Sequence, residues 1–450
     1  MKIQYVSISP TESAKQNDCY ALTPELLAAT GARYSRNNEG LDAIVSKIDF
    51  SNTDKSVDGI FKMVDYGHAS IADMAPIALF IDDITLYAAY FLWTLSPTAG
   101  GQECSTRYIK MDSSNVASAD DLGIYEEYEQ QYILYVTKSF NYYEQALEDW
   151  TKIGELSPEL TKIPTKLLES TSEKDKKQVS RMMRNFAFDR ARVYLPVSTL
   201  TGVMMIQSAR AWANLSAHLQ SHNLKELNLI GKEIEEKLKL GAPRLVRHCK
   251  STDAIKSYYD REFELWLSDY DLFHGTNLYA PPMTVAKNDL DFRTNRYSPF
   301  SSNLSRIPVK VSWSDMSFGE IRDLNRHRTG NKYCPFIPKG FYGAIDELPN
   351  SDLEECNNLI NMHKRFESTT WDSQNIMKSN SEYVYFTSLG HQYLFEHTTT
   401  ADKFLYEMEL RTGVGAHYKY AEHCHKALEL WYQKHPITKG IIFEGSAEPE

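Results

Sequence analysis

The stretch APIALFIDDITLYAAYFLWTL, residues 75–95, is the most apolar long segment of this 450-residue sequence. Its first part, to Ile81, predicts a strand, and the remainder to Leu95 predicts a buried helix. Asp82 and Asp83 interrupt the apolar run, so it does not suit a bilayer-spanning segment. The sequence therefore predicts a strand followed directly by a helix inside a globular core.

A second strand-helix pair follows later in the chain. Residues 307–313, IPVKVSW, alternate between apolar and polar and predict a strand, and residues 314–328 predict a helix. Each half of the chain then runs through a loop and a long helix to a terminal helical pair. We therefore hypothesise a diverged tandem duplication with halves at 1–242 and 243–450. The alternative is that any α+β protein shows this rough order.

Charge and cysteine usage narrow the class of protein. Lys and Arg number 49 against 60 Asp and Glu, a net charge of -11, which argues against non-specific binding to nucleic acid or to an anionic membrane. A small anionic ligand needs only a local group of arginines. The six cysteines form no CxxC pair, and the N-terminus lacks a signal-peptide pattern. We expect a reduced, soluble, cytoplasmic protein.

Several short motifs place arginine beside other polar groups, and guanidinium groups suit phosphates and carbonyl edges. The arginines of these motifs also have purely structural explanations: favourable contact with a helix C-terminus, a polar turn, or a solvated edge of an extended segment. Arg210 and Asn214 share one helix face in an apolar segment, where a charge needs a partner or a ligand. The motifs are Gln102–Tyr108 (QECSTRY), Arg190–Pro196 (RARVYLP), Ser208–Arg210 (SAR) with Asn214, Arg326–Arg328 (RHR) and Leu410–Gly413 (LRTG).

Other kinds of site find no support. The sequence has neither GxGxxG nor a Walker A loop, so the two common phosphate cradles are absent. His391, Glu396 and His397 do not share a helix face, and the adjacent ligands of His423-Cys424-His425 point in different directions. We expect no metal site.

Taken in order, these motifs resemble the flavin-dependent thymidylate synthases (ThyX). Gly67–Met74 (GHASIADM) is similar to an upstream segment of that family, and Ser105–Tyr108 (STRY) to its Ser-x-Arg-Tyr. Arg192–Pro196 is similar to the family's Leu-Pro segment, and Ser208–Asn214 to its Asn-Ala-Arg helix. The family's RHR triplet is missing from the first half but intact at Arg326–Arg328, and its Gln before the triplet corresponds to Leu92 or Asp323.

The resemblance implies an α+β fold with two ThyX-like halves, each a small antiparallel sheet with long helices, together forming a pseudo-dimer. It implies FAD-dependent conversion of dUMP to dTMP, with NADPH and methylenetetrahydrofolate as co-substrates. The catalytic arginines would be Arg107, Arg192 and Arg411. The residues that would hold dUMP are Glu103, Ser105, Arg107, Arg192 and Arg411. The residues that would hold FAD are His68, Ser70, Arg210, Asn214, Arg326, His327 and Arg328.

Two other functions stay open on the sequence. One is an enzyme of the same fold that acts on another pyrimidine nucleotide, for example by hydroxymethylation. The other is a paralogue that binds flavin or nucleotide without catalysis. Because the family assembles homotetramers, the resemblance also implies a homodimer of these double-length chains.

Overall fold

A computed structural model of the chain describes residues 1–17, 19–62, 69–107, 109–269, 275–282, 285–377, 380–413 and 416–445. The chain forms two compact units that are discontinuous in sequence. Unit 1 comprises Met1–Cys104, Val116–Tyr125 and Ser198–Arg261; unit 2 comprises Ser105–Asn115, Glu126–Val197 and Glu262–Glu450. Within the described ranges, no helix is long and apolar enough to cross a membrane.

Unit 1 is built on an antiparallel sheet of four strands in the order β1-β2-β4-β3. The apolar stretch that opens the sequence analysis supplies strand β2 and helix α6. The strand continues past Ile81 to Thr85 because a β-bulge carries the chain through Asp82 and Asp83, and Asp83 takes the left-handed φ of 56°. The strands are β1 (Lys2–Val6), β2 (Pro76–Thr85), β3 (Gly100–Glu103) and β4 (Leu200–Ser208).

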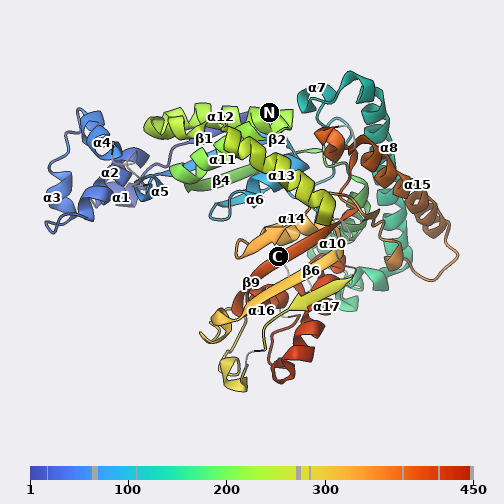
Figure 1. The fold of residues 1–450 in the computed structure, drawn as a ribbon. Helices are drawn as coiled ribbons and strands as arrows, with labels where there is room; N and C mark the ends of the chain where they lie inside the picture. The colour runs from blue at the N-terminus through green and yellow to red at the C-terminus, as the bar shows by residue number, and fades with distance from the viewer. Residues whose placement is uncertain are drawn as a thin grey trace. The chain divides into compact units, whose positions relative to one another are not determined.

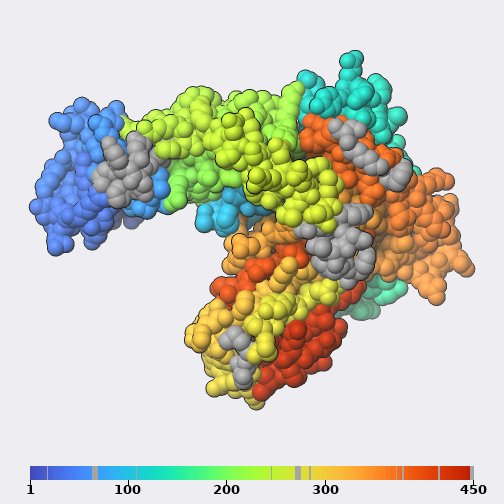
Figure 2. All heavy atoms as spheres, viewed as in Figure 1, coloured from blue at the N-terminus to red at the C-terminus, as the bar shows by residue number. Residues whose placement is uncertain are grey.

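Helices α11 and α12 pack along this sheet, and the N-terminal helices gather at one end of unit 1 (Figures 1 and 2). The apolar residues of α12 recur at helical spacing and face inward, which explains why this helix lies on the sheet. The helices are α1 (Glu12–Gln16), α2 (Pro24–Tyr34), α3 (Leu41–Val45), α4 (Thr53–Phe61), α5 (Ser70–Asp73), α6 (Leu86–Thr94), α7 (Ala119–Leu122), α11 (Ala209–Ser221) and α12 (Lys225–Gly241).

Unit 2 contains the second sheet, with the order β5-β6-β9-β7 and β8 paired to β9. Helices α16 and α17 lie on it, while α8, α10 and α15 pack together (Figure 1). The strands are β5 (Thr276–Tyr279), β6 (Pro308–Ser317), β7 (Asn331–Tyr333), β8 (Gly340–Phe341) and β9 (His391–Thr400). The helices are α8 (Glu126–Leu156), α9 (Thr165–Leu168), α10 (Glu173–Ala191), α14 (Phe318–Asn325), α15 (Glu354–Met377), α16 (Ala401–Arg411) and α17 (Tyr418–Lys434); α13 (Asp253–Asp269) begins in unit 1 and ends in unit 2.

The central strand pair of each sheet has the same register. In β2 and β4, Pro76 lies opposite Ser208, and in β6 and β9, Pro308 lies opposite Thr400. Both pairs carry a bulge after the sixth residue of the first strand, at Ile81 and at Trp313. In both units the first strand leads directly into a helix, α6 or α14. The two sheets therefore repeat one local design.

Three segments differ from the sequence-based predictions. The Ala- and Met-rich residues 198–220 predict one helix, but they form strand β4 and then α11. The helix predicted at 314–328 begins only at Phe318, because β6 continues to Ser317. The alternation of Arg190 and Arg192 predicts one face of an extended segment, but Arg190 lies in the last turn of α10 and Arg192 in the 3-10 turn that follows it.

The junction of β2 and α6 depends on a buried carboxylate from α12. Glu226 accepts hydrogen bonds from the backbone N–H and the hydroxyl of Thr85, both at 2.8 Å, and the same hydroxyl caps α6 by accepting from the N–H of Ala88 at 3.0 Å. Replacing Glu226 by alanine leaves two buried donors without this acceptor. We expect Glu226→Ala to lower the free energy of unfolding by about 2–4 kcal/mol, measured by urea denaturation. The exposed Glu233→Ala on the same helix serves as the control, and an equal loss in both variants would contradict this account.

Candidate functional site

Helix α14 presents two buried carboxylates on one face in unit 2. Ser317 at the end of β6 caps the helix, and Glu320 accepts from its backbone N–H at 3.0 Å and from its hydroxyl at 2.6 Å. Asp323 follows one turn later on the same side. A carboxylate in a protein interior needs cationic partners, and unit 2 supplies them from several distant segments.

Four arginines surround Asp323, and we call them the arginine cluster: Arg107, Arg192, Arg326 and Arg411. Buried Arg192 places Nη2 3.3 Å from the Asp323 carboxylate and donates from Nη1 to the Thr106 hydroxyl at 3.3 Å. Arg326, partly exposed, lies 3.9 Å from the other carboxylate oxygen. Burial by itself would raise the pKa of Asp323, but the four guanidinium groups hold it well below its usual range.

Arg107 has a carboxylate partner of its own. It meets Asp189 in a two-pronged contact, Nε to Oδ1 at 2.8 Å and Nη2 to Oδ2 at 2.9 Å. Burial opposes ionisation of Asp189, yet the adjacent Arg107 keeps the pKa of this carboxyl below its usual value. The Ser105 hydroxyl accepts from the Arg107 backbone N–H at 3.2 Å, which fixes the loop that carries the arginine.

Arg411 binds the histidine of the RHR triplet. Its Nε donates to Nε2 of His327 at 2.7 Å, so this nitrogen acts as the acceptor and the ring is neutral. Burial lowers the pKa of His327 to about 4, in agreement with that protonation state. Burial likewise lowers the pKa of His417 to about 4, and this ring donates from Nε2 to the Asp189 carbonyl at 3.1 Å.

The charges of this region leave a surplus. Four guanidinium groups face the ionised carboxylates of Asp189, Asp323 and Glu407, and the two nearby histidines are neutral. The arginine cluster therefore carries more positive charge than these carboxylates balance. A phosphate monoester matches that surplus in sign and in hydrogen-bonding geometry.

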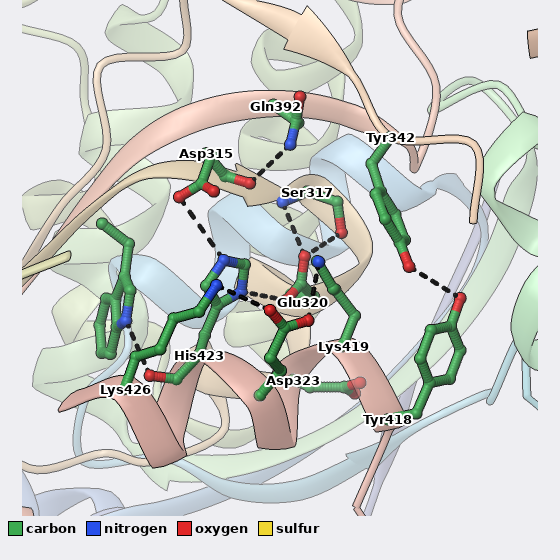
Figure 3. A network of polar contacts seen from close by, with 12 residues as sticks. Asp315, Ser317, Glu320, Asp323, Tyr342, Gln392, Tyr418, Lys419, His423 and Lys426 are labelled. Atoms are coloured by element: carbon green, nitrogen blue, oxygen red, sulfur yellow. Dashed lines mark hydrogen bonds and ion pairs between the residues drawn. The ribbon is translucent and has the colours of Figure 1, made fainter. Parts of the chain in front are cut away.

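The neighbouring histidine of α17, His423, is bound between carboxylates (Figure 3). Its Nδ1 lies 2.7 Å from Glu320, and its Nε2 lies 3.5 Å from Asp315, which stands at the bulge of β6. Burial opposes the charged ring, but Glu320 and Asp315 raise the pKa of His423 to about 9. His423 is thus an imidazolium that neutralises the first carboxylate of α14 and links α17 to the β6–α14 junction.

Unit 1 contains a separate open cavity of about 480 Å³. Arg210 and Asn214 from α11 line it together with Ser208, Thr98 and His248. Asp73, at the end of α5, lies 2.8 Å from the Arg210 guanidinium and accepts from the Ser208 hydroxyl at 3.2 Å. The lining offers several hydrogen-bond donors to an anionic group, but its guanidinium, that of Arg210, is already paired with Asp73.

The sequence-predicted residues fall into separate groups. The three predicted catalytic arginines lie together around Asp323, with Ser105 in the same loop as Arg107. Arg326 is itself a member of this cluster, and His327 contacts it through Arg411. Glu103 ends β3 in unit 1, where Ser70, Arg210 and Asn214 also lie, and His68 is outside the described residues. Arg328, the last of the triplet, follows His327 in unit 2.

Sequence reasoning missed the carboxylates that hold this region together. Asp189 has a local signal, an acid next to Arg190, and Glu320 has one in its spacing from the Ser317 cap. His423 attracted notice only as a metal ligand. In the part of the chain that the structure describes, no group of three or more His, Cys, Asp or Glu residues could hold a metal ion.

The charged state of His423 makes its contribution to stability depend on pH. Its folded pKa of about 9 lies above the unfolded value of about 6.5, so the stabilisation is complete below pH 6.5 and disappears as the pH rises through 9. We expect the difference in unfolding free energy between the native chain and His423→Gln to shrink between pH 6 and pH 10. Urea denaturation at both pH values measures it, and a difference that does not change with pH would show that His423 is neutral.

Comparisons with known proteins place the first half of the chain in a family. The family described as thymidylate synthase complementing protein (Thy1) matches residues 20–244. A UPF0159 protein of Chlamydia pneumoniae is 26% identical over 239 residues, which are 48% of this chain and 44% of that protein, so the match spans less than half of the relative.

Two solved structures are also similar. They are of PolB from Streptomyces cacaoi, a UMP/dUMP methylase, bound with 5-Br dUMP or 5-Br UMP. They show 17% and 16% identity, cover 55% of this chain and 93% and 92% of PolB, and have TM-scores of 0.32 and 0.31. From the family match over residues 20–244, the chain belongs to the thymidylate synthase complementing protein family.

Proposed function

We propose that this chain is a flavin-dependent thymidylate synthase that converts dUMP to dTMP with methylenetetrahydrofolate and NADPH. The observation that carries the proposal is the excess of positive charge in the arginine cluster, which suits the anionic phosphate of a nucleoside monophosphate. Membership of the family supports the same conclusion. As a reaction class this is an FAD-dependent methyl transfer.

Arg107, Arg192 and Arg411 are the residues that we propose to contact dUMP in unit 2. Guanidinium groups in a desolvated setting bind the phosphate, and they stabilise negative charge on a uracil carbonyl as carbon 5 attacks the one-carbon unit. Their own partners fix them before substrate arrives, because Asp189, Asp323 and His327 each hold one of them. Ser105 supports the Arg107 loop. Glu103 belongs to unit 1, and it is proposed as a dUMP residue on the resemblance alone.

FAD is the proposed cofactor, and it would supply the redox step. Arg210 and Asn214 line the cavity of unit 1, and their donor chemistry fits an anionic dinucleotide once the Arg210–Asp73 pair opens. Ser70, in α5 of the same unit, is proposed on the resemblance. Arg326, His327 and Arg328 belong to unit 2, where His327 already accepts from Arg411, and they are proposed for FAD on the resemblance alone. His68 completes the proposed set.

Assembly and origin form part of the same proposal. The identical strand register and bulge position of the two sheets support a tandem duplication with halves 1–242 and 243–450. We propose that two chains pair as a homodimer in the cytoplasm, without nucleic acid or membrane as partner. All six cysteines are free thiols, as expected in a reducing compartment.

One observation favours a second candidate, action on a different pyrimidine nucleotide. Asp323 is ionised, so it can only accept hydrogen bonds. A carboxylate suits the exocyclic amine of cytosine, which donates, better than the uracil carbonyl at the same position. The ligand titration below therefore includes dCMP.

The first test is the visible absorbance spectrum of the purified protein, before and after dUMP. We expect a flavin spectrum that dUMP perturbs with saturation, because the proposed reaction requires the nucleotide to meet the flavin. A larger change of the flavin spectrum with dCMP than with dUMP would indicate that the substrate is a cytosine nucleotide. Absence of a flavin spectrum, even after FAD is added, would refute the proposed flavoenzyme.

The second test separates the Arg107 guanidinium from its structural role. Arg107→Ala removes a charge-assisted contact, so we expect dUMP affinity in the spectral titration to fall about tenfold to a hundredfold. Asp189→Asn is the matched variant, because it removes the same ion pair but keeps the guanidinium. We expect Asp189→Asn to retain dUMP binding, and equal losses in both variants would mean that the pair acts only in folding.

A further inference from the structure

Unit 2 contains a second cavity that the proposed chemistry leaves unused. It is open to solvent and has a volume of about 1210 Å³. Helix α10 forms one wall, and residues from the start and middle of α17 line the cavity as well. Only Arg107 and Asp189 are shared with the region of the arginine cluster. The other lining residues therefore have no role in the proposed reaction.

The acidic groups of this cavity are all neutralised. Asp189 is paired with Arg107, and Glu347 is paired with Arg190 at 2.7 Å. Glu422 lies 2.8 Å from Lys419 and 2.7 Å from Lys426, neither of which lines the cavity. An incoming anion thus meets no uncompensated carboxylate among the described lining residues.

Three cations of the lining have no such partner, and we call them the basic wall: Lys162, Arg181 and Arg184. Arg181 and Arg184 are three residues apart on α10, so they project from neighbouring positions. Among the residues that the structure describes, the side chains of the basic wall make no hydrogen bond or ion pair. The cavity therefore presents three uncompensated positive charges.

Lys162 is held in an unfavourable backbone conformation. Its φ of 55° lies in the left-handed region, at the end of the 3-10 turn Pro158–Thr161. A lysine there costs more than a glycine, and such strain is found preferentially at functional positions. The conformation brings Lys162 to the cavity beside α10.

Arg190 adds a buried cation at the inner end of the wall. Its guanidinium lies 3.9 Å from the ring centre of Phe186 and 4.2 Å from that of Tyr418. Its Nη2 is paired with Glu347 at 2.7 Å, so the two rings and this carboxylate fix the guanidinium in place. Leu160, Met182 and Phe186 add apolar surface to the same cavity, enough to contact an organic ring.

We propose that this cavity binds an organic oligophosphate, of the nucleoside triphosphate class, through the basic wall. Three unpaired cations match a chain of phosphates better than a single phosphate, and the apolar surface accommodates the organic part. The site is independent of the proposed synthase reaction, because it uses none of the residues assigned to flavin, and only Arg107 of those assigned to dUMP lies at its border.

Isothermal titration of the full chain with UTP, inorganic tripolyphosphate and orthophosphate tests the proposal. We expect UTP to bind tightest, tripolyphosphate next, and orthophosphate at least about tenfold more weakly. Arg181→Ala/Arg184→Ala should weaken UTP binding about tenfold or more. The control Lys174→Ala/Lys177→Ala removes two charges with the same spacing from the same helix outside the cavity, and it should change binding less than about twofold.

Lys162→Gly provides a variant that keeps the fold, because glycine relieves the left-handed strain, and it should also weaken UTP binding. Equal losses in the control would show non-specific charge attraction and overturn the proposal. Equal affinities for UTP and tripolyphosphate would contradict the claim that the cavity contacts the organic group of the ligand. Absence of saturable binding would contradict the claim that the cavity binds an oligophosphate. The Arg181/Arg184 variant should keep its flavin response to dUMP, so failure of this proposal is separable from failure of the synthase assignment.

Discussion

The pairing of buried charges on one face of α14 is the interaction on which unit 2 depends. Glu320 and Asp323 cannot stay ionised in the interior without cations, and those cations come from segments far apart in the chain. His423 arrives from α17 and Arg192 from the end of α10. The two carboxylates of α14 thus require cations from these particular segments, and the resulting ion pairs position the arginine cluster. A charge of the wrong sign in any of these segments would leave a buried group unpaired.

The sequence was sufficient to predict the elements with a clear period and the arginines with a motif. The strand-helix pairs at 75–95 and near 307–328 are present, and the three arginines chosen by resemblance do lie together. Strand β4 was missed because its Leu, Met and Gln residues favour helices, although alternate residues are buried. The partners Asp189 and Glu320 could not be assigned, because an isolated acid gives no sign of which distant cation it will meet.

The two sheets show how one backbone design can be maintained by different hydrogen bonds. At the end of β2 the capping residue Thr85 is held by Glu226, which comes from α12. At the end of β6 the capping residue Ser317 is held by Glu320, three residues along its own chain. In unit 2, therefore, no residue of α17 holds the capping residue; His423 of α17 binds the carboxylate of Glu320 instead. Equivalent positions have therefore acquired different partners while the strand register has stayed the same.

The discontinuous make-up of unit 2 has a consequence for how the chain is made. Residues 105–115 and 126–197 belong to that unit, but its sheet lies after residue 262. At roughly 5–20 residues per second, translation of the missing part takes on the order of ten seconds or more. During that interval α8 and α10 are outside the ribosome without α15, and Arg192 is there without Asp323. Unit 1, whose last strand is complete at Ser208 and whose chain ends at Arg261, can fold first. The α8–α10 pair then forms a long insertion in unit 1 whose remaining partners are still to be synthesised.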